Sequence, residues 1–307
     1  MSPPAENGAE GPGRAGPDWL TLAAFVGVVL IGGSNFVAVR FSNRELPPFL
    51  GAGIRFGLAA VLLLALVRIQ GLELPRGRAL LGAAIFGLVT FTGAYALTYY
   101  GLVQAQAGLG AVFAAFAPLL TIFLTAAQRV EPFRWRGLLG ALFAIVGVLI
   151  MTRAPSVAGV PLGSLLALFG LAVCISESGI IVKQFPRMHP VALNAVAMAI
   201  GTPPLLVLSL VTGEQWRVPT SLSTWLTLAY VVPVGSVLLF VLVVYVLNRW
   251  TATALSYATV LFPVVSFGLG ALLASEALSP ALAAGAAVTI IGVYLGALRR
   301  ADAPAKS

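Results

Sequence analysis

Apolar runs about 20 residues long recur throughout this chain, and they limit its fold more than any other feature. A run of that length spans the apolar core of a membrane when it forms a helix. Only 9% of the 307 residues are Asp, Glu, Lys or Arg, while 59% belong to the set AVILMFWYC, and the mean hydropathy is +1.00. Because a soluble domain carries about 25% charged residues, this chain cannot cover a water-facing surface. We therefore expect an all-α integral membrane protein.

Short segments with Pro, Gly or Arg separate the runs, for example Arg76-Gly77-Arg78. Transmembrane strands would alternate polar and apolar residues, whereas these runs are apolar all round. Residues 1–18 are rich in Pro, Gly and Ala and predict a disordered N-terminal tail, and the run that follows is too long for a signal peptide. The sequence predicts ten membrane-spanning helices, over residues 19–39, 47–67, 79–100, 105–126, 135–152, 162–184, 190–211, 222–247, 252–274 and 280–298.

The distribution of Lys and Arg predicts that both termini are cytoplasmic. Cytoplasmic segments of membrane proteins carry an excess of these residues. With the N-terminus inside, the outer segments hold four of them, Arg40, Arg44, Arg153 and Arg217. The inner segments then hold thirteen: Arg14, Arg68, Arg76, Arg78, Arg129, Arg134, Arg136, Lys183, Arg187, Arg249, Arg299, Arg300 and Lys306.

The chain also matches itself after a shift of about 145 residues. Pairs with this spacing are Pro118 and Pro263, Glu131 and Glu276, Tyr100 and Tyr245, Gly140 and Gly285, and Gly147 and Gly292. The unit contains five predicted helices, so we expect a first repeat over residues 19–152 and a second over 162–300. Because five is odd, the second copy enters the membrane inverted. Inverted repeats of this kind build secondary transporters, with a site near the middle of the membrane.

Four short motifs carry a resemblance to a known family. They are Gly32-Gly33-Ser34-Asn35-Phe36, Gly53-Ile54-Arg55-Phe56, Ala117-Pro118-Leu119 followed by Glu131, and Phe262-Pro263-Val264 followed by Glu276. Together they resemble the drug/metabolite transporter superfamily of the EamA type, and within it the bacterial aromatic amino-acid exporters of the YddG type. Gly32 stands where the family usually has Trp, and Met198 aligns with Arg55 in the second half.

This resemblance implies a fold and a function. It implies ten helices in two inverted repeats and a multi-pass exporter in the bacterial inner membrane. The expected substrates are amino acids, aromatic and other bulky ones, moved by alternating access with broad specificity. The alternatives are an exporter of cationic drugs or other metabolites, and a membrane scaffold that transports nothing.

Two charged residues, Arg55 and Glu177, lie inside predicted spans and away from their ends, where charge is costly and often functional. Glu177 is a candidate for binding a substrate ammonium or a proton, or it is a helix-end carboxylate paired with Lys183 or a backbone group. Arg55 lies about 12 Å from the outer end of its helix. It either binds a substrate carboxylate or has a structural role, reaching outward or bonding to carbonyls of a neighbouring helix.

Polar and aromatic residues complete the candidate substrate site. Ser34 and Asn35 in the first repeat match the region of Ser176, Glu177 and Ser178 in the second, so the repeat places two polar clusters at mirrored depths. An aromatic wall for bulky side chains is expected from Tyr95, Tyr99 and Tyr257. The other interpretation of these tyrosines is an interfacial belt at the helix ends.

Pro118 and Pro263 lie inside predicted helices and are repeat mates. Each removes a backbone hydrogen bond, so the pair predicts either two gating hinges or two static kinks.

Enzyme and cofactor chemistry find little support in the sequence. No GxSxG, HExxH or phosphate-loop pattern occurs, and His189, the only histidine, lies past the end of a span. One cysteine, Cys174, excludes an intrachain disulfide. We expect no catalytic residues, no metal, no cofactor and no nucleic-acid partner, and a chain that can act as a monomer among membrane lipids.

Overall fold

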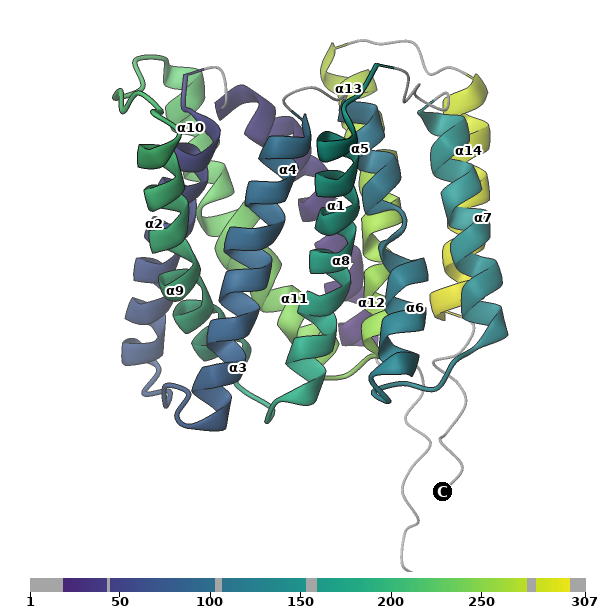
Figure 1. Cartoon of the computed structure of the whole chain (residues 1–307), viewed down its shortest axis with the longest axis horizontal. Helices are drawn as coiled ribbons and strands as arrows, with labels where there is room; N and C mark the ends of the chain where they lie inside the picture. Colours follow the sequence, from purple (N-terminus) through teal and green to yellow (C-terminus); the bar gives the residue numbers. More distant parts are fainter. Residues whose placement is uncertain (1–18, 43–44, 103–106, 153–158, 275–279, 299–307) are drawn as a thin grey trace, which may run out of the picture.

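The computed structural model describes residues 19–42, 45–102, 107–152, 159–274 and 280–298. Within these ranges every regular element is a helix, and the helices stand side by side in one bundle (Figure 1). The tail predicted over residues 1–18 and Glu276 lie outside the described residues. The first half contains α1 (Trp19–Ser42), α2 (Pro48–Ile69), α3 (Arg78–Gly87), η1 (Leu88–Gly93), α4 (Ala94–Leu102), α5 (Ala107–Ala114), α6 (Ala117–Ala127) and α7 (Trp135–Met151).

The second half has a similar series of elements. It contains α8 (Leu162–Gln184), α9 (Pro190–Val211), α10 (Leu222–Val231), η2 (Pro233–Leu238), α11 (Leu239–Leu247), α12 (Ala252–Ser256), α13 (Ala258–Ala274), α14 (Pro280–Val293) and η3 (Tyr294–Leu298). Proline opens α2 and α9, where its fixed φ suits the first turn and its missing N–H costs nothing.

By length and composition, six helices in the described ranges can cross a membrane. They cover Pro48–Ile69, Arg78–Thr98, Leu109–Ala127, Leu162–Gln184, Pro190–Val211 and Leu222–Leu247. Four shorter apolar helices cover Trp19–Asn35, Trp135–Met151, Ala252–Ser266 and Ala283–Ala297. Each of these stretches overlaps a span predicted from the sequence. The number of ten crossings and the side of the termini stay predictions.

The internal repeat reappears in the positions of the helices. Adding 145 to the bounds of α4, 94–102, gives those of α11, 239–247, and the same step takes the start of α7 at 135 to the start of α14 at 280. A step of 142 takes α2, 48–69, to α9, 190–211. In Figure 1 the mates α2 and α9 lie together at one side of the bundle, and α7 and α14 at the other.

The mates α7 and α14 run antiparallel, with glycines where their backbones meet. A Cβ atom at Gly140 would lie 2.7 Å from the carbonyl oxygen of Gly292, and one at Gly147 would lie 2.7 Å from that of Gly285. The residue numbers of the contacting positions therefore decrease along α14 as they increase along α7. Small residues allow this close approach, which drives helix association in lipid. Repeat mates that point in opposite directions are the arrangement expected of an inverted repeat.

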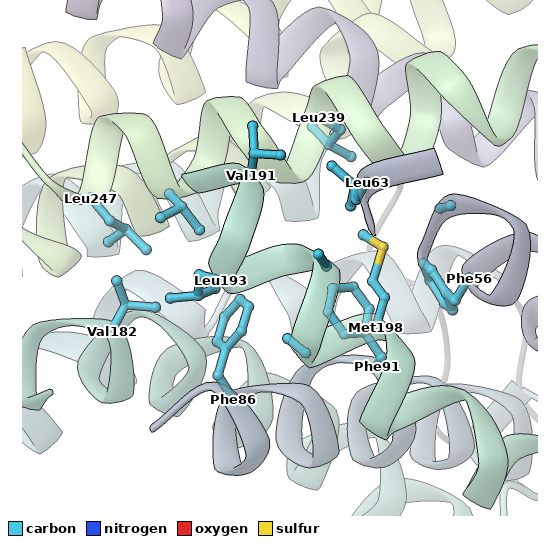
Figure 2. Packing of buried hydrophobic residues seen from close by; sticks show 14 of the residues in the cluster. Phe56, Leu63, Phe86, Phe91, Val182, Val191, Leu193, Met198, Leu239 and Leu247 are labelled. Carbon is cyan, nitrogen blue, oxygen red and sulfur yellow. The ribbon is translucent and has the colours of Figure 1, made fainter. Parts of the chain in front are cut away.

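The larger apolar core lies between α2, η1 and α9. It includes Phe56, Phe91 and Met198, which are fully buried. Figure 2 shows Met198 between Leu63 and Phe91, with Phe56 close by. A second cluster, which includes Val148, Val260 and Val293, joins α7, α13 and α14, and Tyr257, between α12 and α13, is part of it.

Carboxylates from loops cap the N-termini of distant helices. Glu131, after α6, accepts from the backbone N–H of Ala252 at 2.6 Å, at the start of α12. Glu214, after α9, accepts from the N–H groups of Phe49 and Leu50 at 3.0 and 2.8 Å, at the start of α2. These N–H groups have no partner within their own helix, and negative charge is favoured at this end. The caps fix loops of one half to helices of the other.

Glu45, just before α2, caps α10 in the same way. Its carboxylate accepts from the Thr220 hydroxyl at 3.0 Å and from the N–H of Ser221 at 3.2 Å. The nearby Thr224 hydroxyl, then the Ser221 N–H, lower the pKa of Glu45 below its ordinary value of 4.5 because they favour the ionised form.

The glycine contacts lead to a first prediction. Gly147→Ala should destabilise the protein by about 1–3 kcal/mol, because the added methyl group would collide with the backbone of α14. The control is Gly268→Ala on α13, where an added Cβ meets no atom within 4 Å. The thermal stability of the two variants in detergent checks this. Equal stability would show that the α7–α14 approach is looser than described.

A second prediction concerns pH. Because the pKa of Glu45 is lowered in the folded state, its cap stabilises above the unfolded value near 4.5 and the contribution is lost as the pH falls below it. Glu45→Gln should therefore flatten the decline of thermal stability between about pH 6 and pH 3. Glu73→Gln, at an exposed loop carboxylate, is the control and should follow the wild type. If thermal stability depends on pH in Glu45→Gln as it does in the wild type, the Glu45 cap does not contribute to stability.

Candidate functional site

Two π-helical segments mark the middle of the bundle. η1 continues α3 into α4, and η2 continues α10 into α11. Adding 145 to the bounds of η1, 88–93, gives those of η2, 233–238, so the segments are repeat mates. The wider turn of a π-helix displaces backbone carbonyls from their regular partners, and such segments are frequent at functional sites.

The carbonyl oxygen of Gly235 in η2 accepts two side-chain hydrogen bonds. Asn35 of α1 donates through Nδ2 at 2.8 Å, and Arg55 of α2 donates through Nη2 at 2.6 Å. Arg55 also donates through Nε to the hydroxyl of Ser236 at 2.6 Å. A Cβ atom at Gly235 would collide with Oδ1 of Asn35, so a side chain here would displace the Asn35 amide from this position. The first two helices of the first half thus hold the π segment of the second half.

The other π segment is held in the mirrored way. The Thr90 hydroxyl of η1 donates to the hydroxyl of Ser178 on α8 at 2.8 Å, and Thr92 donates to the carbonyl of Gly201 on α9 at 2.9 Å. Thr90 is the repeat mate of Gly235, and Ser178 is the mate of Asn35 at a step of 143. The first two helices of the second half therefore hold the π segment of the first half, but with neutral groups only.

We call each of these two sets of hydrogen bonds a clamp. Ser34 lies one residue before Asn35 of the clamp on η2 and is half-buried. Its hydroxyl donates to the carbonyl of Ile31 at 2.9 Å and lies 2.6 Å from the hydroxyl of Tyr230, near the end of α10. The glycines before it, Gly32 and Gly33, face Phe262 and Val265 of α13 with no space for a side chain. Glycine at these two positions thus lets α13 approach α1 closely.

Glu177 lies toward the end of α8 and is half-buried. Its carboxylate accepts from Nε2 of Gln128 at 2.6 Å, and Gln128 accepts in turn from Nε2 of Gln184 at 2.6 Å. Among the described residues, Glu177 forms no ion pair with Lys183. These two hydrogen bonds join the C-terminal ends of α6 and α8.

Ser176 and Tyr257 use their hydroxyls to join helices. Ser176 is buried and donates to the carbonyl of Ala117 at 3.0 Å, which links α8 to α6. Tyr257 is 0% exposed, and its hydroxyl donates to the carbonyl of Gly137 on α7. Both side chains have protein on all sides in this conformation.

Tyr95 differs from Tyr257 because it is half-buried. Its ring packs edge-on against Phe56 at 4.7 Å between centroids, and Phe56 packs in turn on Phe91 at 4.9 Å. None of the described residues hydrogen-bonds the Tyr95 hydroxyl. The side chain of Tyr99 lies outside the described part of the chain.

The two prolines have different surroundings. Pro118 is the second residue of α6, after a break at Ala115 and Phe116, and the carbonyl of Ala114 that it leaves free accepts from the Thr259 hydroxyl at 3.3 Å. Pro263 lies inside α13 with no break in the helix. The break in the first half and the continuous helix in the second show that the two sites do not have the same geometry.

Sequence reasoning missed Tyr230, Gly235, Ser236 and Gln128. The available signal was Pro233, a proline in the middle of a span, which opens η2. Among the described residues, no group of three His, Cys, Asp or Glu side chains is arranged to hold a metal ion.

Comparison with known proteins agrees with this architecture. An "Uncharacterized inner membrane transporter YedA" of Escherichia coli (strain K12) is 28% identical over 289 residues, covering 93% of each chain. A "Probable amino-acid metabolite efflux pump" of Salmonella typhimurium is 28% identical and covers 87% of this chain and 91% of its own. A crystal structure with 21% identity has the same fold, with a TM-score of 0.78 over 92% of this chain and 99% of the other.

The model of the EamA-like transporter family matches twice, over residues 19–153 and 162–297. The chain thus contains two copies of one family unit, and they account for nearly all the described helices. The protein belongs to the EamA-like transporter family.

Proposed function

We propose that this membrane transporter exports amino acids across the bacterial inner membrane by alternating access. The substrates are aromatic and other bulky amino acids, with broad specificity. The chain crosses the membrane ten times in two inverted repeats, with both termini in the cytoplasm and one chain sufficient for transport. As a member of its family the protein is a transporter rather than an enzyme.

The observation that carries this proposal is the exchange of clamps between the halves. Each π segment is held by the first two helices of the opposite half, through Asn35 and Arg55 on one side and through Ser178 and Gly201 on the other. In alternating access, one repeat moves against the other around a site near the middle of the membrane. Contacts between the two halves at mid-span are placed where such a movement would act. The repeat mates α7 and α14 run antiparallel, which supports the inverted arrangement.

Half-buried polar groups supply candidate contacts for an amino acid. Ser34, Ser178 and Glu177 are half-buried around the clamps, and Asn35 lies next to Ser34. In this proposal they pair the charged ends of the substrate, since an unpaired charge in an apolar site is costly. Ser176 and Tyr257, which bond to carbonyls of neighbouring helices, take part by holding those helices in place.

Tyr95 and Tyr99 supply the apolar wall in this proposal. Tyr95 is backed by Phe56 and Phe91, so a bulky side chain would rest against a rigid aromatic cluster. Such a wall discriminates weakly, by about 1–3 kcal/mol per missing contact, which favours a broad range of substrates. Pro118 and Pro263 are the hinges of the two gates. The name of the Salmonella relative supports amino-acid metabolites as the cargo.

Transport by purified protein in liposomes tests the proposal. We expect uptake of phenylalanine and methionine above empty liposomes, and slower uptake of threonine. A quaternary ammonium dye serves as the competing substrate, with and without a pH gradient. Uptake of the dye alone would favour a drug exporter, and no uptake of any compound would favour a scaffold.

The aromatic wall leads to a separate prediction. Tyr95→Ala should slow phenylalanine transport about tenfold, while threonine transport falls less than about twofold because its small side chain gains little from the wall. Tyr100→Ala is the control, because Tyr100 lies on the same helix α4 and is 61% exposed. Initial uptake rates in liposomes measure the effect. An equal loss for both amino acids would remove Tyr95 from the site.

A further inference from the structure

Arg55 carries a positive charge that the described part of the chain does not neutralise. It lies seven residues after the start of α2, about 10 Å along the helix. The side chain is only 4% exposed. Among the described residues its hydrogen-bond partners are the Gly235 carbonyl and the Ser236 hydroxyl, which are both neutral. A buried cation without a counter-ion is unfavourable inside a membrane and is by default a sign of function.

The hydrogen bonds of the guanidinium group leave one edge free. Nε and Nη2 donate to Ser236 and Gly235, whereas no described residue accepts a hydrogen bond from Nη1. A guanidinium group has five N–H donors in a fixed fork, so most of its donors remain available. The face of the group also lies over the ring of Phe56, 5.1 Å from the centroid, which holds it in place.

A second unpaired group lies beside it. Asn35 is 8% exposed, and its Oδ1 atom is buried without a hydrogen-bond partner among the described residues. Because Asn35 and Arg55 both bond the Gly235 carbonyl, a free donor set and a free acceptor lie around one backbone oxygen. Buried polar groups are normally paired, so two such groups side by side indicate a missing ligand.

We propose that Arg55 binds the carboxylate of the transported molecule, with Asn35 Oδ1 accepting from its ammonium group. This inference rests on the proposed transport function and narrows its substrate class to amino acids and other organic carboxylates. Cations without a carboxylate are excluded from this site. The fork of the guanidinium group matches a carboxylate in shape as well as charge.

The two halves of the repeat differ at this site. Met198, which aligns with Arg55, is fully buried among apolar side chains, and the mirrored clamp on η1 has only hydroxyl and carbonyl groups. The carboxylate therefore binds at η2 and not at η1. The substrate keeps one orientation relative to the two halves throughout the transport cycle.

Binding of three related probes to the purified protein tests the assignment. The probes are phenylalanine, phenylalaninamide, which lacks the carboxylate, and 3-phenylpropionate, which lacks the ammonium. We expect phenylalaninamide to bind at least about tenfold more weakly than phenylalanine. Arg55→Gln should raise the Kd for phenylalanine and for 3-phenylpropionate by about tenfold or more, and change that for phenylalaninamide less than about twofold.

Two further variants separate binding from folding. Arg68→Gln removes an exposed arginine from the same helix α2 and should bind all probes like the wild type. Ser236→Ala removes the acceptor of Nε but keeps the charge, so it should retain the preference for the carboxylate. If Arg55→Gln does not fold, the comparison of phenylalanine with its amide in the wild type decides the question.

Three results would overturn the inference. They are equal affinity of the wild type for phenylalanine and its amide, an equal loss for both in Arg55→Gln, and no binding of any probe. If the liposome assay still shows uptake of another compound, the transport function stands and only the role of Arg55 is withdrawn. If no compound is taken up, the proposed function fails as well.

Discussion

Every backbone N–H and C=O group inside a membrane must find its partner within the protein, and this constraint organises the structure. A regular helix meets it alone. At several points a side chain from another segment supplies a backbone partner. The Gly235 carbonyl is bonded by Asn35 and Arg55, the Ala117 carbonyl by Ser176, and the Ala252 N–H by Glu131. Irregular backbone is therefore where distant parts of the sequence are joined.

These joints connect the two halves more than they connect neighbours within one half. Asn35 and Arg55 reach from the first half to η2, and Ser178 reaches from the second half to η1. A displacement of one half therefore acts directly on the π segment of the other. The charge of Arg55 is the main difference between the two clamps. In the proposed function the two clamps belong to two related gates, and this one residue makes them chemically unequal.

The sequence predicts the helices and the repeat well, for a physical reason. Lipid requires long uninterrupted apolar runs, so each span is visible without knowledge of its neighbours. A duplicated unit keeps prolines and glycines at fixed steps, and glycine is required where backbones touch, as at Gly140 and Gly147.

The site is harder to predict, because a run that is apolar all round does not show which face of a helix meets which partner. Tyr95 and Tyr257 both lie deep in predicted spans, yet one is half-buried and the other fully buried in a core cluster. One alternative from the sequence had Arg55 bonding to carbonyls of a neighbouring helix, as it does at Gly235. A π turn has no residue pattern of its own beyond Pro233, so η2 could not be identified as that partner. The partner of Glu177 is an exposed glutamine at the end of another helix, which spacing along one helix cannot indicate.

Distances between spin labels at the two ends of the bundle test alternating movement of the halves most directly. Cys174, the only cysteine, is first replaced by alanine. One label pair is Tyr100 with Val218, where α4 ends and α10 begins, and the other is Trp135 with Arg187, where α7 begins and α8 ends (Figure 1). All four side chains are exposed, and each pair joins the two halves. The account predicts that phenylalanine shifts the two distances in opposite directions. Distances that stay fixed at both ends, or that change in the same direction, would contradict it.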